Sequence, residues 1–280
     1  MKQILLPTDF SDNSWNAILL ARKLFAGEKC HFIILNCYVP KKQNFSGFKS
    51  SLRTGTVLTG LKKASEEGLS AVLSELNSRS THELHTFSTI SSKEELVPQI
   101  KRLIPEYDLD LIIMGAKGST ASGHIFMGSN TVAVIKKIRN CPLISVPENF
   151  NFQSLKQVVF PTDYTNFYSK DVLRLLIEIV QYWKSQVLVV HFGREFILTD
   201  SQKANKEILM ERLRNTNCNF EQHHMSSTLS DAISKYAENR SADMICLVKK
   251  EHTFLEQLTR EPAIKKVVFN TRVPLLAMPV

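Results

Sequence analysis

The chain has 280 residues, of which 43% are hydrophobic and 22% are charged, and its formal net charge is +8. These fractions are typical of soluble globular proteins, and the length allows one large domain or two of ordinary size. No apolar run approaches the roughly 20 residues that cross a bilayer, and the N-terminal stretch lacks the cleavage site of a signal peptide. We therefore expect no membrane partner and a cytoplasmic location.

The basic residues and the cysteines argue against two further kinds of site. The lysines and arginines are scattered, mostly as Lys-Lys pairs on helical stretches, which does not favour a nucleic-acid partner. The five cysteines include no C-x-x-C pair, and no Cys/His pair has the spacing of zinc ligands. We expect buried, reduced thiols and no zinc site.

Apolar runs alternate with helical patterns from the first residues onward. In the first half these runs predict strands at 2–7, 31–38, 83–88, 110–115 and 142–147. Helical patterns lie between them, near 12–26, 57–79, 92–104 and 129–139. The segment 39–56 is polar and basic and has no periodic pattern, so we expect a mobile loop there.

The second half repeats this alternation. Its predicted strands are 156–161, 186–192, 219–224, 243–248 and 273–279, and its predicted helices lie near 165–183, 200–215, 228–240 and 254–269. Ser11 or Asp12 is expected to cap the first helix, and Thr165 is expected to cap its counterpart. A serine of the Ser91-Ser92-Lys-Glu-Glu stretch is expected to form a capping box.

The chain contains two copies of one unit. Residues 2–11 read KQILLPTDFS and residues 156–165 read KQVVFPTDYT, with five of ten positions identical. The ends repeat as well, since 140–147 is NCPLISVP and 272–279 is RVPLLAMP. A polar connector at 148–154 then separates two predicted domains, 1–148 and 155–280.

The pattern predicts an α/β fold. The continuous apolar runs at 33–35 and 187–190 are typical of strands that are covered on both faces. Alternation of such strands with helices predicts parallel sheets with right-handed crossovers. We therefore expect two similar, doubly wound, five-stranded parallel-sheet domains in tandem.

Glycines are concentrated in the stretch GAKGSTASGHIFMGSNT, residues 115–131, which holds four of the ten glycines of the chain. Gly115 and Gly118 follow a strand, where glycine lets a ligand approach the backbone. Gly128 to Thr131 begin a helix, whose free N–H groups favour an anion, and the hydroxyls of Ser129 and Thr131 add donors. The alternative is that these residues only make a turn and a cap. Neither a P-loop nor a dinucleotide fingerprint is present.

This spacing resembles a known family. Gly115-x2-Gly118-x9-Gly128-Ser129 matches the ATP-binding motif of the universal stress protein family, and the PTDFS opening and the closing PLISVP strand are also similar to it. The whole chain resembles a tandem pair of such domains. The resemblance implies a Rossmann-like fold of the nucleotide-binding α-hydrolase type, with ATP and a Mg²⁺ ion at the carboxyl edge of the sheet.

The resemblance also implies roles for single residues. Asp9 would contact adenine, together with the backbone at Cys37. The ribose and the first phosphates would be bordered by Pro7, Thr8, Met114 and Gly115, and the phosphates would be held by Gly118, Gly128, Ser129, Asn130 and Thr131. Three alternatives stay open: Asp9 only caps a helix, the side chain of Cys37 only packs in its strand, and Lys117 and His124 either reach a phosphate or stay in solvent.

The second half keeps Pro161-Thr162-Asp163 but loses the glycines. Alignment of the two halves places Val248 and Glu251 at the positions of Gly115 and Gly118. A second alignment, of Pro142 with Pro274, places Arg260, Glu261 and Pro262 at the positions of Gly128, Ser129 and Asn130, so the loop is one residue shorter in this half. The side chains at these positions would block the backbone, the carboxylates would repel phosphate, and the proline has no N–H to donate. We therefore expect that this half does not bind ATP in the same way as the first half.

Two readings of the second half follow. It can serve as a built-in dimer partner, with 142–147 pairing with 273–279 inside one chain, or its site can be repurposed for another ligand or protein. For the whole chain we expect an ATP-binding stress-response or signalling protein in which the nucleotide orders loops that an unidentified protein partner reads. A slow ATPase or nucleotide hydrolase, a nucleotide-independent adaptor and a further association of two chains remain alternatives.

Overall fold

The structure is a computed structural model that describes residues 1–39, 50–78, 84–117, 127–193, 197–225, 227–249 and 272–279. The elements of the first half are β1 (Lys2–Pro7), α1 (Asp12–Leu24), β2 (Cys30–Cys37), α2 (Ser50–Ser78), β3 (His85–Ser92), α3 (Leu96–Tyr107), β4 (Leu111–Gly115), α4 (Ser129–Lys137) and β5 (Leu143–Val146). The elements of the second half are β6 (Gln157–Pro161), α5 (Lys170–Trp183), β7 (Gln186–Gly193), α6 (Asp200–Leu213), β8 (Asn217–His224), α7 (Leu229–Asn239), β9 (Met244–Lys249) and β10 (Leu275–Pro279).

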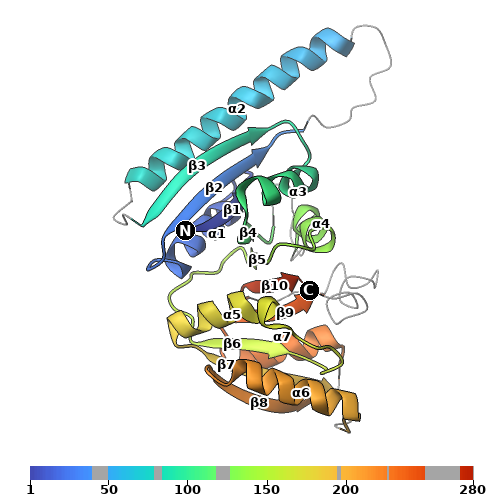
Figure 1. The fold of residues 1–280 in the computed structure, drawn as a ribbon. Helices are drawn as coiled ribbons and strands as arrows, with labels where there is room; N and C mark the ends of the chain where they lie inside the picture. The colour runs from blue at the N-terminus through green and yellow to red at the C-terminus, as the bar shows by residue number, and fades with distance from the viewer. Residues whose placement is uncertain are drawn as a thin grey trace.

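The strands form one ten-stranded sheet in the order β3-β2-β1-β4-β5-β10-β9-β6-β7-β8. Within each half neighbouring strands are parallel, whereas β5 and β10 pair antiparallel, with Leu276 opposite Ile144. The closing strands of the two copies therefore meet inside one chain (Figure 1). The α/β fold with two similar, doubly wound halves is confirmed.

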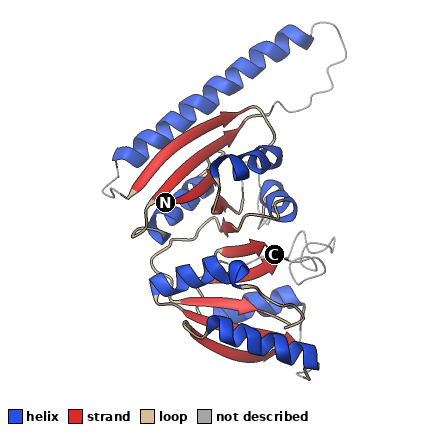
Figure 2. Cartoon of the chain, in the orientation of Figure 1, coloured by secondary structure: helices blue, strands red, loops and turns tan. Residues whose placement is uncertain are grey.

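Helices cover both faces of the sheet (Figure 2). Strand residues alternate between two cores, as in β1, where Ile4 and Leu6 face one core and Leu5 faces the other. The first core is closed by α1, α2, α5 and α6, and the second is closed by α3, α4 and α7. Each core extends over both halves, because helices of both copies contribute to it. Within the described ranges, no helix is long and apolar enough to cross a membrane.

Several expected boundaries are wrong. The predicted loop 39–56 overlaps α2, which begins at Ser50, while residues 40–49 lie outside the described ranges. Helix α5 begins at Lys170 and is capped by Ser169, not by Thr165, because the side chain of Ser169 accepts the N–H of Val172. Helix α3 begins at Leu96 without a side-chain cap, because the serines of the expected capping box end β3. The helix expected at 254–269 lies outside the described residues.

The connector between the halves is packed rather than merely polar. Phe152 is buried and meets the ring of Trp183 edge-on at a centroid distance of 5.2 Å. The backbone carbonyl of Phe152 also accepts a hydrogen bond from Lys23 Nζ at 3.0 Å. Residues of both halves therefore hold the connector in place.

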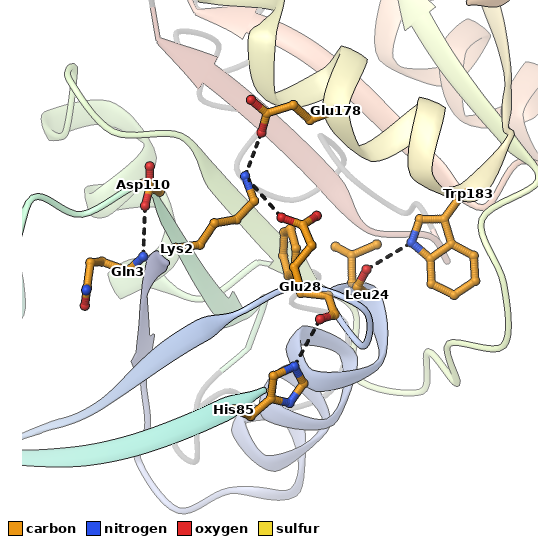
Figure 3. A network of polar contacts seen from close by, with 9 residues as sticks. Lys2, Gln3, Leu24, Glu28, His85, Asp110, Glu178 and Trp183 are labelled. Carbon is orange, nitrogen blue, oxygen red and sulfur yellow. Dashed lines mark hydrogen bonds and ion pairs between the residues drawn. The ribbon is translucent and has the colours of Figure 1, made fainter. Parts of the chain in front are cut away.

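Direct contacts join α1 and β1 of the first half to α5 of the second (Figure 3). Trp183 Nε1 donates to the carbonyl of Leu24 at 3.0 Å. Lys2 Nζ lies 2.6 Å from Glu178 Oε2 and 3.5 Å from Glu28 Oε2, so one ammonium bridges two carboxylates from different halves. Although burial alone would lower the pKa of Lys2, these carboxylates raise it above its usual value.

Candidate functional site

The predicted site residues gather at one edge of the sheet. Strands β2, β1 and β4 are neighbours and parallel, so Cys37, Thr8 and Gly115 all stand at adjacent carboxyl ends. The start of α4 is fastened beside them, since the N–H of Gly128 donates to the carbonyl of Ala116 at 2.6 Å. Gly118 and His124 lie outside the described residues.

The Pro-Thr-Asp triplet forms a tight turn after β1. Thr8 Oγ1 accepts the N–H of Phe10 at 3.0 Å, and Phe10 adopts a φ of 64°. Asp9 Oδ1 accepts the N–H and the hydroxyl of Ser11 at 3.2 and 2.6 Å. Ser11 in turn is the N-cap of α1, through its contact with the N–H of Ser14. The carboxylate of Asp9 therefore braces the cap instead of being the cap.

The second half builds the same turn. Thr162 Oγ1 accepts the N–H of Tyr164 at 3.0 Å, and Tyr164 has a φ of 58°. Asp163 Oδ1 accepts the N–H and the hydroxyl of Thr165 at 2.9 and 2.7 Å. Because the half without the glycine stretch keeps these three hydrogen bonds, the triplet is explained by the turn that it makes and does not by itself indicate a nucleotide.

Gly115 is explained in part by Asn13, a residue that the sequence analysis missed. A Cβ on Gly115 would lie 2.7 Å from Asn13 Oδ1 and 2.9 Å from its Cγ. The Asn13 side chain, 3% exposed, donates to the carbonyl of Val146 at 3.0 Å and accepts the N–H of Lys117 at 2.8 Å. Asn13 thus ties α1 to the ends of β4 and β5 in the space that a side chain at 115 would need.

The second missed residue is Asn36, which stands in the apolar run of β2. It is buried, and its Nδ2 donates to the carbonyl of Thr8 at 2.8 Å. His191 takes the corresponding place in β7, with Nδ1 3.1 Å from the carbonyl of Thr162. A polar residue inside a predicted buried strand was the available signal for both side chains, because such a residue needs a partner.

The first turn of α4 is the part of the edge that best fits an anion. Its N-cap is Gly128, which supplies no side-chain cap. In the part of the chain that the structure describes, the N–H groups of Ser129 and Asn130 meet no acceptor, and both residues are exposed. Open N–H groups and the positive end of the helix dipole favour a phosphate at this position.

Thr131 does not supply the hydroxyl that the sequence analysis expected. Its side chain is 2% exposed, and Oγ1 donates to the carbonyl of Gly115 at 2.9 Å. The hydroxyl therefore fastens α4 to β4. Thr131 could therefore donate to a ligand only through its backbone N–H, beside those of Ser129 and Asn130.

Three further residues that were expected at the site are Lys117, Met114 and Cys37. Lys117 Nζ forms an ion pair with Glu148 at 2.8 Å, which holds it away from full solvent exposure. The Met114 side chain is buried in the core beneath the edge. Burial, with a contribution from Glu94, raises the pKa of the Cys37 thiol to about 12, so the thiol is neutral at pH 7. The side chains of Met114 and Cys37 both pack on the core, so the part of each residue that could face a ligand is its backbone.

The register of the sheet supports the comparison between the two halves. Asp110 Oδ2 accepts the N–H of Gln3 at 2.8 Å, as Asp243 Oδ2 accepts that of Gln157 at 2.9 Å. Gly115 pairs with Val146 in β5, and Val248 pairs with Met278 at the same place in the repeat. Val248 is 8% exposed, so a packed side chain stands where Gly115 has none. Glu251, Arg260, Glu261 and Pro262 lie outside the described residues.

The described residues fit a nucleotide better than a protein-held metal ion. Among them, no group of three or more His, Cys, Asp or Glu side chains is placed to hold a metal. A magnesium ion that accompanies a triphosphate needs few protein ligands, because phosphate oxygens and waters fill most of its positions. The donor set at the start of α4 is therefore compatible with a phosphate chain that brings its own cation.

Solved structures with the same fold cover the whole chain. A universal stress protein from Archaeoglobus fulgidus DSM 4304 matches with a TM-score of 0.69 and 17% identity, over 99% of this chain and 96% of that one. A protein of unknown function from Pseudomonas aeruginosa PAO1 matches with a TM-score of 0.64 and 13% identity, over 100% and 92% of the two chains. At such identities these similarities concern the fold.

Sequence comparison identifies the family. No curated protein matches the chain. The model of the universal stress protein family matches residues 1–147, the half that carries the glycine stretch. The resemblance noted in the sequence is thereby confirmed, and the chain belongs to the universal stress protein family.

Proposed function

We propose that the chain binds one ATP molecule, with Mg²⁺, at the carboxyl edge of its first half and acts in stress response or signalling. The observation that carries the proposal is the first turn of α4, where the N–H groups of Ser129 and Asn130 are exposed and have no described acceptor. This turn lies beside the ends of β1, β2 and β4, where ligands of open α/β sheets bind.

The residues would act as follows. Asp9 and the backbone at Cys37 would face the base, and Pro7, Thr8, Met114 and Gly115 would border the ribose and the first phosphates. Gly118, Gly128, Ser129, Asn130 and the backbone of Thr131 would donate to the phosphates. The Asp9 carboxylate would brace the turn at Ser11 through Oδ1 and also accept from the base, because an ionised carboxylate has about four acceptor positions.

The two halves would have different roles. Residues 1–148 would form the nucleotide-binding domain. Residues 155–280 would form a domain with a degenerate site that serves as a dimer partner inside the chain. The β5–β10 pairing supports the second role, and the packed Val248 at the position of Gly115 supports the loss of the second site.

The sharpest test is Asn130→Asp. A carboxylate on the first turn of α4 stabilises the helix through its dipole, by about 0.3–1 kcal/mol, but it repels a phosphate. We expect the thermal midpoint to stay constant or rise, while the affinity for Mg-ATP measured by calorimetry falls at least about tenfold. Opposite effects on stability and on affinity cannot arise from a damaged fold.

Asn130→Gln is the matched control, because it changes the length of the side chain without adding charge. It should bind Mg-ATP within about twofold of the wild type, since backbone N–H groups are the proposed donors. Absence of Mg-ATP binding by the wild-type protein would refute the proposal. Equal affinity of the Asp variant and the wild type would place the phosphates elsewhere.

A further inference from the structure

The side chain of Lys249, a residue of the second half, contacts the first half. It is the last residue of β9, and its Nζ donates to the carbonyls of Ile135 and Ile138, the latter at 2.8 Å. Ile135 lies in the last turn of α4 and Ile138 is its C-cap. A side chain of the second half thus satisfies carbonyls that the end of a helix leaves without partners.

The antiparallel join of the halves explains this contact. Helix α4 starts at the carboxyl edge of its own strands and therefore ends toward their amino ends. Because Leu275 pairs with Ser145 and Ala277 with Leu143, the second half runs in the opposite direction. The carboxyl end of β9 consequently lies next to the C-terminal end of α4 (Figure 1).

In the repeat, Lys249 takes the position of a residue of the first half that also contacts α4. Val248 corresponds to Gly115 in the register of the sheet, so Lys249 corresponds to Ala116. The carbonyl of Ala116 holds the N-terminal end of α4 through Gly128, and Lys249 holds the C-terminal end of the same helix. Equivalent positions of the two copies therefore support opposite ends of one helix.

The contact is partly removed from water. Burial, together with the nearby charge of Arg139, lowers the pKa of Lys249 to about 8, so the ammonium form still predominates at pH 7. The last turn of α4 already carries Lys136 and Lys137, and a further cation is tolerated here because it points at carbonyl oxygens. The amine also keeps N–H donors when it is neutral, so the contact does not depend on its charge alone.

We propose that Lys249 is a positioning residue through which the second half holds α4 and thereby sets the first turn of that helix for its anion. The inference rests on the proposed nucleotide site. Through this contact the second half, with its degenerate site, would directly influence the affinity of the first half for the nucleotide. The second copy would then be more than a partner that covers an edge of the sheet.

The test compares Lys249→Met, Lys249→Arg and Lys137→Met in the full chain at pH 7. Methionine keeps the length of the side chain and leaves the backbone pairing of residue 249 with Pro279 intact, so β9 should remain in place. Lys137 is an exposed cation on the same helix end and controls for the loss of charge alone. Hydrogen exchange of the α4 amides and calorimetry with Mg-ATP are the two measurements.

We expect Lys249→Met to speed exchange in α4 selectively and to weaken Mg-ATP binding about three- to tenfold. Arg at 249 should restore both properties, and Lys137→Met should bind within about twofold of the wild type. Unchanged exchange in α4 would overturn the inference, as would unchanged affinity despite faster exchange. If the wild type binds no Mg-ATP, the proposed function fails, while exchange in α4 still decides whether Lys249 holds the helix.

Discussion

At the scale of single residues, Gly115 shows how one position can satisfy two demands. In a sequence motif it is read as backbone left open for phosphates. In the structure its missing Cβ also makes room for Asn13, which joins α1 to the ends of β4 and β5. The site edge is therefore shaped by packing beneath it before any ligand arrives.

This explanation predicts a non-additive pair of substitutions. Gly115→Ala alone should destabilise the protein by about 1–3 kcal/mol, because its methyl group would meet the Asn13 amide. In an Asn13→Ala background the same change should cost at least about 1 kcal/mol less, since the amide is gone. Urea unfolding of the four proteins gives the cycle. Strict additivity would show that Asn13 is not the reason for glycine at 115.

Single residues were also where prediction from sequence stopped. The Pro-Thr-Asp triplet and the start of α4 at Ser129 could be located from local patterns alone. The partners of Asn13, Asn36 and Lys249 could not, because they are carbonyls on other elements, distant in the chain. Which carbonyl lies within reach depends on strand order, which a local pattern does not contain.

At the scale of elements, strands were predicted more closely than helix starts. Continuous apolar runs identify buried strands directly, and β1 begins and ends where expected. The start of α5 was missed because Ser and Thr serve both in turns and in caps. Thr165 completes the turn with Asp163, whereas Ser169 caps the helix. Ser and Thr are both preferred N-cap residues, so the residue type alone does not distinguish the two positions.

The two roles should separate in stability measurements. Ser169→Ala removes the acceptor for the N–H of Val172 and should cost about 0.5–2 kcal/mol in unfolding free energy. Thr165→Ala removes an exposed hydroxyl that donates to Asp163 and accepts from Asn166, so it should cost less than half as much. Chemical unfolding followed by circular dichroism measures both. A larger effect at Thr165 would restore it as the cap.

At the scale of the whole molecule, the strand order is symmetric about the centre of the sheet. Equivalent strands of the two copies lie at equal distances from the β5–β10 pair. Each half contributes its closing strand to the centre and its third strand to the outer edge. The sheet, two cores and the contacts of Lys2, Trp183 and the connector all cross the boundary between the copies. The two halves of the chain therefore share an extensive internal interface.

Trp183 should contribute strongly to this interface. Trp183→Ala removes a large ring that packs on Phe152 and should lower the unfolding free energy by about 3–5 kcal/mol. Trp183→Phe keeps an aromatic ring but loses the donor to Leu24, at a cost of about 0.5–1.5 kcal/mol. Circular dichroism during urea unfolding gives both values. Tyr182→Ala, a change at a half-exposed neighbour, should cost less than Trp183→Ala, and equal costs would count against a specific role.

The central place of β10 has a consequence for the order in which the protein folds. Residues 275–279 come after the other nine strands in the sequence, yet they lie between β5 and β9. During synthesis both halves can acquire most of their sheets while the neighbours of β10 still present unpaired backbone. Such open strand edges bind each other readily, so an unfinished chain is prone to associate with another through β5 or β9. Arrival of β10 closes both edges at once.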